Sequence, residues 1–69
     1  MRKVRQLRER AGLKQEDMAT ILNISVANYS KKESGIIRFS LPEARVLAEY
    51  FDASIEEIFF ADDVSKKKQ

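Results

Sequence analysis

A chain of 69 residues is long enough for one domain only, and its core is so small that stability must come from closely packed helices or a second subunit. It contains neither cysteine nor histidine, which excludes disulfides and the usual zinc sites. No segment approaches the ~18 apolar residues of a membrane span, and no apolar stretch follows the basic start, so neither a membrane anchor nor a signal peptide is predicted. We expect a cytoplasmic protein without a membrane partner.

The net charge of +2 is unevenly distributed along the chain. Residues 1–38 carry nine basic and four acidic side chains, whereas residues 39–63 carry one basic and seven acidic side chains, and three lysines follow at 66–68. This polarity suits a domain that presents one face to a polyanion. Solvated helix faces explain it equally well, so the charge pattern does not decide the function.

Apolar spacing predicts a first helix over residues 2–11. Val4, Leu7 and Ala11 fall on one face of this helix. Gly12 follows at a position where a helix commonly ends on a residue with positive φ.

Two further helices are predicted over residues 15–22 and 26–33, separated by a short turn. Asn23 begins the turn and tolerates the left-handed conformation better than most residues. Ser25 is a favourable N-cap for the helix that follows.

The next helix, over residues 41–51, has a strong start signal, because Ser40 and Glu43 have the spacing of a capping box. Its apolar face is formed by Leu41, Ala44, Leu47, Ala48 and Phe51. Ser54 and Glu57 repeat the capping pattern before a short fifth helix. The apolar residues of that helix are Ile55, Ile58 and Phe59.

Five short helices without a strand pattern predict a compact all-α domain over residues 1–61, followed by a short charged tail at 62–69. Catalysis is poorly supported, since the chain has no glycine-rich phosphate loop and no metal-ligand spacing. Adjacent carboxylates occur, but helix starts and the tail account for them: Glu16/Asp17, Glu56/Glu57 and Asp62/Asp63. We expect a protein that is not an enzyme and binds no metal or cofactor.

Residues 15–35 carry the most informative pattern. Two helices joined by about three residues cross steeply, which turns the second helix outward. Its outward face is small or polar and free of acids: Ser25, Val26, Ala27, Asn28, Ser30 and Lys31. Val26 can meet a thymine methyl group and Lys31 can donate to guanine, while Asn28 can reach a phosphate. An ordinary surface helix is the alternative, but a helix with Tyr29 as its main apolar anchor favours a binding role for the other face.

The segment from Leu7 to Ala19 resembles the opening of the lambda-repressor-like, or Cro/XRE-type, helix-turn-helix family, whose pattern runs Leu-Arg-x-x-x-Gly-Leu-(Ser/Thr)-Gln-x-x-(Leu/Met)-Ala. Later segments are similar to the family at the family's spacing: Asn23-Ile24-Ser25, Glu33-Ser34-Gly35, Leu47-Ala48-x-x-Phe51 and Ser54-Ile55-Glu56-Glu57-Ile58-Phe59. The resemblance covers about residues 2–60. It implies a five-helix DNA-binding domain with the helix-turn-helix at the second and third helices.

The resemblance also implies roles for individual positions. Gln15 matches a phosphate-contacting glutamine at the start of the second helix, and Arg38 lies in a loop that often touches the DNA backbone. Base-contacting positions are matched by Ser25, Val26, Ala27 and Lys31, and a phosphate-contacting position by Asn28. Arg8 and Glu33 match a structural ion pair that ties the first helix to the end of the third.

Several residues depart from the family pattern. Lys14 replaces the usual N-cap of the second helix, which should weaken that cap by about 1 kcal/mol, although its ammonium group can meet a phosphate. Lys32 stands where the family has a core aromatic or aliphatic residue, so its stem must lie along apolar surface or the third helix is shifted. Asn23 and Asp52 occupy positions where glycine is common.

The loop over residues 36–39 is more apolar than is usual in the family. Ile36, Ile37, Phe39 and Phe60 cannot all fit into a small core, so we expect some of them to form an exposed patch that binds a second copy. Family members commonly form two-fold dimers on near-palindromic DNA, with recognition helices about 34 Å apart. A core wrapped around Phe39 is the alternative.

These observations predict a transcriptional regulator that binds double-stranded DNA as a homodimer and acts as a repressor. An antitoxin-type regulator is a close variant. A protein-interaction module that has lost DNA binding is a different class, which Lys32 and the apolar loop favour and the basic half and Gln15 oppose. No small-molecule effector is expected.

Overall fold

The computed structural model describes residues 2–59, and of Arg2 only the backbone. It contains five α-helices: α1 (Arg2–Arg10), α2 (Gln15–Leu22), α3 (Val26–Ser34), α4 (Leu41–Tyr50) and α5 (Ile55–Phe59). None of the described residues is in a strand. The prediction of an all-α, five-helix fold is therefore confirmed. The expected domain end at residue 61 and the tail at 62–69 lie outside the described residues.

The capping residues read from the sequence begin the helices as expected. At α4 the Ser40 hydroxyl accepts a hydrogen bond from the Glu43 amide at 3.2 Å, and the Glu43 carboxylate accepts one from the Ser40 amide at 2.8 Å. Ser54 and Glu57 repeat this exchange at α5, at 3.0 and 2.8 Å. Each pair satisfies two amides that a helix start leaves without partners.

Two residues other than glycine adopt the left-handed conformation just after a helix. Asn23 follows α2 with φ 59°, and Asp52 follows α4 with φ 53°. Both take the place that glycine has in the resembled family, and both have side chains that tolerate this conformation. The chain thus turns sharply where the sequence predicted.

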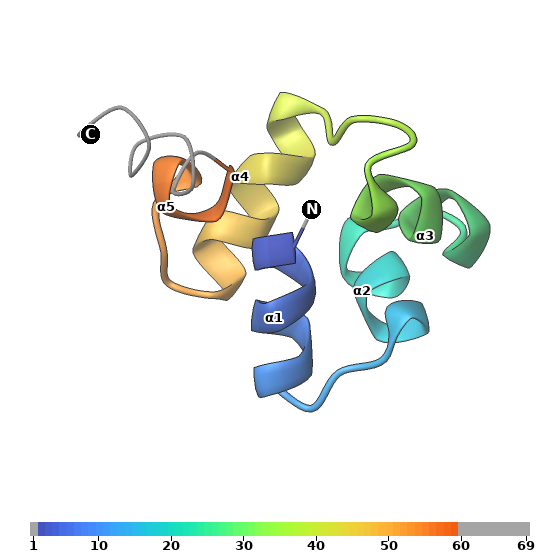
Figure 1. The fold of residues 1–69 in the computed structure, drawn as a ribbon, viewed down its shortest axis with the longest axis horizontal. Helices are drawn as coiled ribbons and strands as arrows, with labels where there is room; N and C mark the ends of the chain where they lie inside the picture. Colours follow the sequence, from blue (N-terminus) through green and yellow to red (C-terminus); the bar gives the residue numbers. More distant parts are fainter. Residues whose placement is uncertain (1, 60–69) are drawn as a thin grey trace.

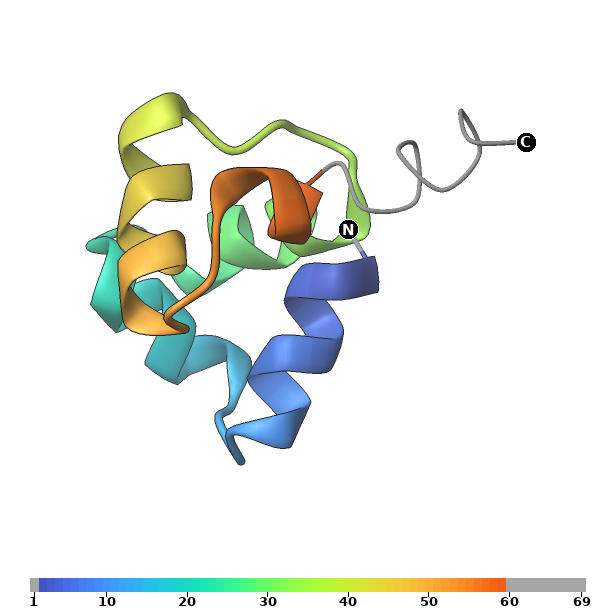
Figure 2. The same cartoon turned by 90° about the vertical axis from the view of Figure 1, so that its left-hand side faces the viewer.

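The helices surround one core. Figure 1 shows α2 and α3 on one side of the domain, α4 and α5 on the other, and α1 between them. The view in Figure 2, taken from the α5 side, has α3 behind α5, at the far end of the domain. Every helix contributes to the core cluster, which consists of Val4, Met18, Ala19, Leu22, Tyr29, Leu47 and Ile58.

Two residues predicted to face the core are exposed instead. Ala11 lies in the turn after α1, which ends at Arg10. Leu41 is 65% exposed in the first turn of α4. Because a helical side chain leans toward the helix N-terminus, a first-turn residue at the edge of the apolar face projects beyond the core.

Phe39 brings the loop between α3 and α4 back to the core. Its ring lies 6.2 Å from that of Tyr29 and 5.6 Å from that of Phe59, both at steep angles. Such edge contacts are favourable between aromatic rings. Within residues 2–59, no helix is long and apolar enough to cross a membrane, and no cluster of three or more side chains is suited to a metal ion.

Candidate nucleic-acid interface

The turn between α2 and α3 orients the third helix. The Ile24 amide donates to the Ala19 carbonyl at 2.9 Å, which closes the end of α2. Ser25 then caps α3, since its hydroxyl accepts from the Asn28 amide at 3.1 Å. Tyr29 is fully buried and anchors α3 in the core. The opposite side of α3 therefore faces solvent.

The four predicted base-contacting residues and the predicted phosphate contact Asn28 lie on that outward side. The structure exposes all five of them: Ser25, Val26, Ala27, Asn28 and Lys31. Ser30, which the sequence also placed there, is half-buried. The one acid of α3, Glu33, is buried, so the exposed surface of this helix carries lysine but no carboxylate. Such a surface suits base edges and phosphates.

The start of α2 lies beside this surface and is only half capped. Lys14 has the extended backbone of an N-cap, but its side chain has no hydrogen-bond acceptor to offer the helix. Asp17 compensates in part, because its carboxylate accepts from the Lys14 amide at 2.8 Å. Lys14 is exposed, so its ammonium group is accessible to an anion.

One buried carboxylate ties three helices together at this surface. Glu33 accepts from Arg8 Nε at 2.7 Å and Nη2 at 3.3 Å, from Gln15 Nε2 at 2.9 Å and from the Tyr29 hydroxyl at 2.8 Å. Arg8 Nη1 also donates to the Leu13 carbonyl at 2.9 Å. The Glu33 network, meaning Arg8, Gln15, Tyr29 and Glu33, therefore links α1, the start of α2, and α3.

The network keeps Glu33 ionised. Burial would raise the pKa of this carboxyl group, but the hydrogen bonds from Arg8, Gln15 and Tyr29 outweigh burial and hold the pKa below its ordinary value. The same contacts act on the donors. The hydrogen bond to Glu33 raises the pKa of Arg8. Burial raises the pKa of Tyr29 most, and its hydrogen bond to Glu33 raises this pKa further. All three groups keep the protonation states that the contacts need at neutral pH.

The structure brings together the expected partners Arg8 and Glu33, and it adds two that the sequence did not assign. Tyr29 lies one helical turn before Glu33, a spacing that could have indicated the contact. Gln15 is 18 residues from Glu33, and no local pattern points to their contact. After this hydrogen bond, the Gln15 amide has one N–H and its carbonyl oxygen left for other partners.

Lys32 is accommodated by an ion pair rather than by apolar contacts alone. Its ammonium group lies 2.6 Å from a Glu43 oxygen, and the two side chains are 13% and 15% exposed. The same oxygen accepts the Ser40 amide that begins α4. Burial would raise the pKa of Glu43, but the bonds from Lys32 and Ser40 lower it. The two residues are 11 positions apart on different helices, and no local pattern in the sequence indicates their contact.

The four residues expected to bind a second copy have different surroundings. Ile36 is 73% exposed, and Ile37 is also exposed. Phe39 is half-buried against the core, which agrees with the alternative of a core wrapped around it. Phe60 lies outside the described residues. Arg38, in the same loop, is exposed.

The sequence model of one protein family, described as a helix-turn-helix domain, matches residues 2–58. The chain belongs to this helix-turn-helix family. The match extends over the described part of the chain and agrees with the resemblance to the Cro/XRE-type domains, and membership indicates a DNA-binding regulator. No curated protein and no solved structure matches the chain significantly.

Proposed function

We propose that this helix-turn-helix protein is a sequence-specific transcriptional regulator. It binds a near-palindromic operator as a homodimer and represses transcription. The observation that carries the proposal is the outward face of α3, which is small, polar and free of exposed acids. An α-helix of this kind fits the major groove, where each base pair has a distinct pattern of hydrogen-bonding groups. This function places the protein in the cytoplasm, with the DNA that it regulates.

The proposal assigns base readout to α3 and anchoring to its surroundings. Lys31 donates to a guanine and Val26 contacts a thymine methyl group, while Ser25 and Ala27 allow close approach to the bases. The phosphate contacts are assigned to Gln15, Asn28, Lys14 and Arg38. These four residues belong to three segments, which are the start of α2, α3 itself and the loop before α4. Their side chains can therefore contact the DNA backbone on either side of the bases that α3 contacts.

Selection from random duplex DNA, followed by titration of affinity against salt, tests the proposal. We expect an inverted repeat to emerge, because a two-fold dimer presents two copies of α3 to successive turns of the groove. Affinity should fall steeply with salt, since a contact set of about six phosphates gives a log–log slope near −5.

Two variants then separate readout from anchoring. Lys31→Ala should relax the base preference at one position by about 1–3 kcal/mol, whereas Gln15→Ala should weaken binding to all sequences alike. A uniform loss of affinity in both variants would remove Lys31 from base readout.

The exposed loop favours a second candidate function, a module that binds another protein. Ile37 and Phe39 line a groove of about 630 Å³ that also reaches Leu41 and Phe59, and Ile36 is exposed nearby in the chain. If the selection enriches no sequence and binding is weak or independent of salt, this surface is the place to seek a protein partner. An antitoxin-type regulator would combine DNA binding with such a partner.

A further inference from the structure

The solvent face of α4 carries large apolar side chains that the core does not use. Leu41 is 65% exposed, Tyr50 51% and Val46 38%. Three such residues on ten positions of one helix are unusual for a surface that meets only water. Two charged residues, Arg45 and Glu49, lie among them one helical turn apart.

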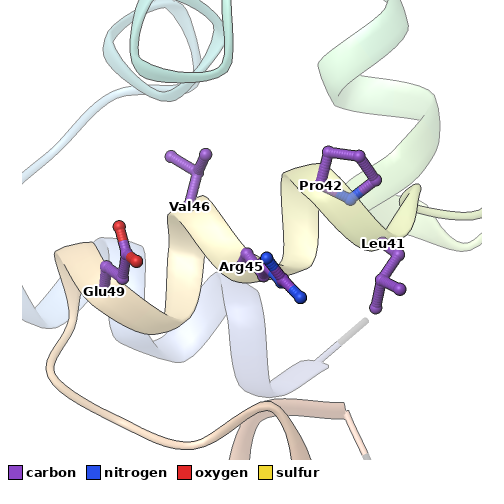
Figure 3. A pocket seen from close by; sticks show the side chains of 5 residues that line it. All are labelled: Leu41, Pro42, Arg45, Val46 and Glu49. Atoms are coloured by element: carbon purple, nitrogen blue, oxygen red, sulfur yellow. The ribbon is translucent and has the colours of Figure 1, made fainter.

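The close-up in Figure 3 shows how these side chains are arranged. Arg45 projects from the middle of α4, with Pro42 and Val46 on one side of the helix and Leu41 on the other, and Glu49 follows one turn later. The five side chains line a shallow hollow of about 320 Å³. Both Arg45 and Glu49 are exposed, and neither forms an ion pair with any residue of the described part of the chain.

We infer that this surface, named the α4 face and made up of the five residues that line the hollow, Leu41, Pro42, Arg45, Val46 and Glu49, binds the α4 face of a second copy of the chain. Arg45 of one copy pairs with Glu49 of the other, and the two-fold axis generates the same pair a second time. The inference rests on the proposed homodimer and specifies where its subunits meet.

Charge complementarity selects a second copy over other occupants. In an interface about a two-fold axis, a contact between residues i and j occurs twice, so a face with one cation and one anion is complementary to itself. A phosphate backbone is attracted by Arg45 but repelled by Glu49. In the same way, a strongly acidic or strongly basic protein is repelled by one of these two charges. With the axis between Arg45 and Glu49, Val46 lies close to its own symmetry copy, which adds apolar contact at the centre.

The α4 face is continuous with the apolar loop. Leu41 lines the hollow on α4 and also the groove formed by Ile37 and Phe39. A second copy on α4 therefore has exposed loop residues at the edge of its contact. The apolar dimer contact that the sequence predicts near Ile37 then forms the margin of an interface whose centre is on α4.

Charge reversal tests the inference directly, with dimerisation measured by sedimentation equilibrium of the whole chain. Arg45→Glu leaves two acids on the face, and Glu49→Arg leaves two bases. The dimer dissociation constant of each single variant should therefore be at least about tenfold higher than that of the wild type. An equimolar mixture of the two variants should form heterodimers, and the double variant should dimerise with itself.

Matched reversals control for net charge. Arg10→Glu on α1 and Glu56→Arg on α5 change exposed residues outside the α4 face and should leave the dimer unchanged. Circular dichroism should show wild-type helix content in all variants, because the substituted side chains are exposed.

The inference is overturned if the single variants dimerise like wild type, or if their mixture stays monomeric. A monomeric wild type at high micromolar concentration also overturns it, and gel-shift with the selected DNA then shows separately whether DNA binding survives. Loss of DNA affinity in Arg45→Glu with an unchanged dimer would assign Arg45 to a phosphate and overturn the pairing with Glu49.

Discussion

Glu33→Gln should destabilise the domain far more than its small change in shape suggests. Arg8, Gln15 and Tyr29 donate hydrogen bonds to both oxygens of this carboxylate, with Arg8 donating to each of the two. An amide keeps one acceptor oxygen and replaces the other with an NH₂ group. Whichever way the amide is turned, that group would face an N–H of Arg8, which cannot accept a hydrogen bond.

The loss of stability in Glu33→Gln can be estimated from the burial of the Arg8–Glu33 pair. The side chains of Glu33 and Arg8 are 5% and 12% exposed, so removing one charge strands the other away from most of the water. Breaking a buried pair costs about 3–5 kcal/mol, and we take about 3 kcal/mol because Arg8 keeps its bond to the Leu13 carbonyl. A domain of this size has a total stability of about 3–10 kcal/mol. The melting temperature should therefore fall by about 12 °C or more.

Urea unfolding followed by circular dichroism measures this loss. Glu16→Gln, an exposed residue of α2, is the matched control and should change stability by less than about 0.5 kcal/mol. Arg8→Met alone should also cost about 3 kcal/mol, and combined with Glu33→Gln it should cost about 2 kcal/mol less than the sum of the two. A loss below about 1 kcal/mol for Glu33→Gln, or additive effects in the double variant, would refute the assignment of the Glu33 network as one coupled unit.

Three further outcomes follow from the same contacts. Lys14→Ser should raise the free energy of unfolding by about 1 kcal/mol in urea titrations, since serine can accept an amide of the first turn of α2. Lys32→Met should cost about 1 kcal/mol when Glu43 is present and close to nothing in a Glu43→Gln background, because its ion pair is then already absent. Folding lowers the pKa of Glu33 and Glu43 below the ordinary 4.5, so stability should be complete above that pH and fall as the pH drops through the lower folded values. Urea midpoints across this pH range should show the fall in wild type and a smaller one in Glu33→Gln.

Much of the secondary structure was predictable because its causes are local. The capping boxes at Ser40 and Ser54 and the left-handed Asn23 act within a few residues of themselves, and their positions therefore appear in the sequence. The outward face of α3 was equally accessible, since a short turn and one aromatic anchor determine which side of the helix is buried. Which of its side chains contact DNA stays a prediction.

Other features were decided only by the packing of helices distant in sequence. The partners of Gln15 and Lys32 are 18 and 11 residues away, and their contacts depend on how α2, α3 and α4 cross. Phe39 joins the core while Leu41 is left exposed, although both are large and apolar, because the loop turns one inward and the first turn of α4 directs the other away. A helical repeat states which residues share a face. Only the tertiary arrangement states what that face meets, since the partners are contributed by other helices.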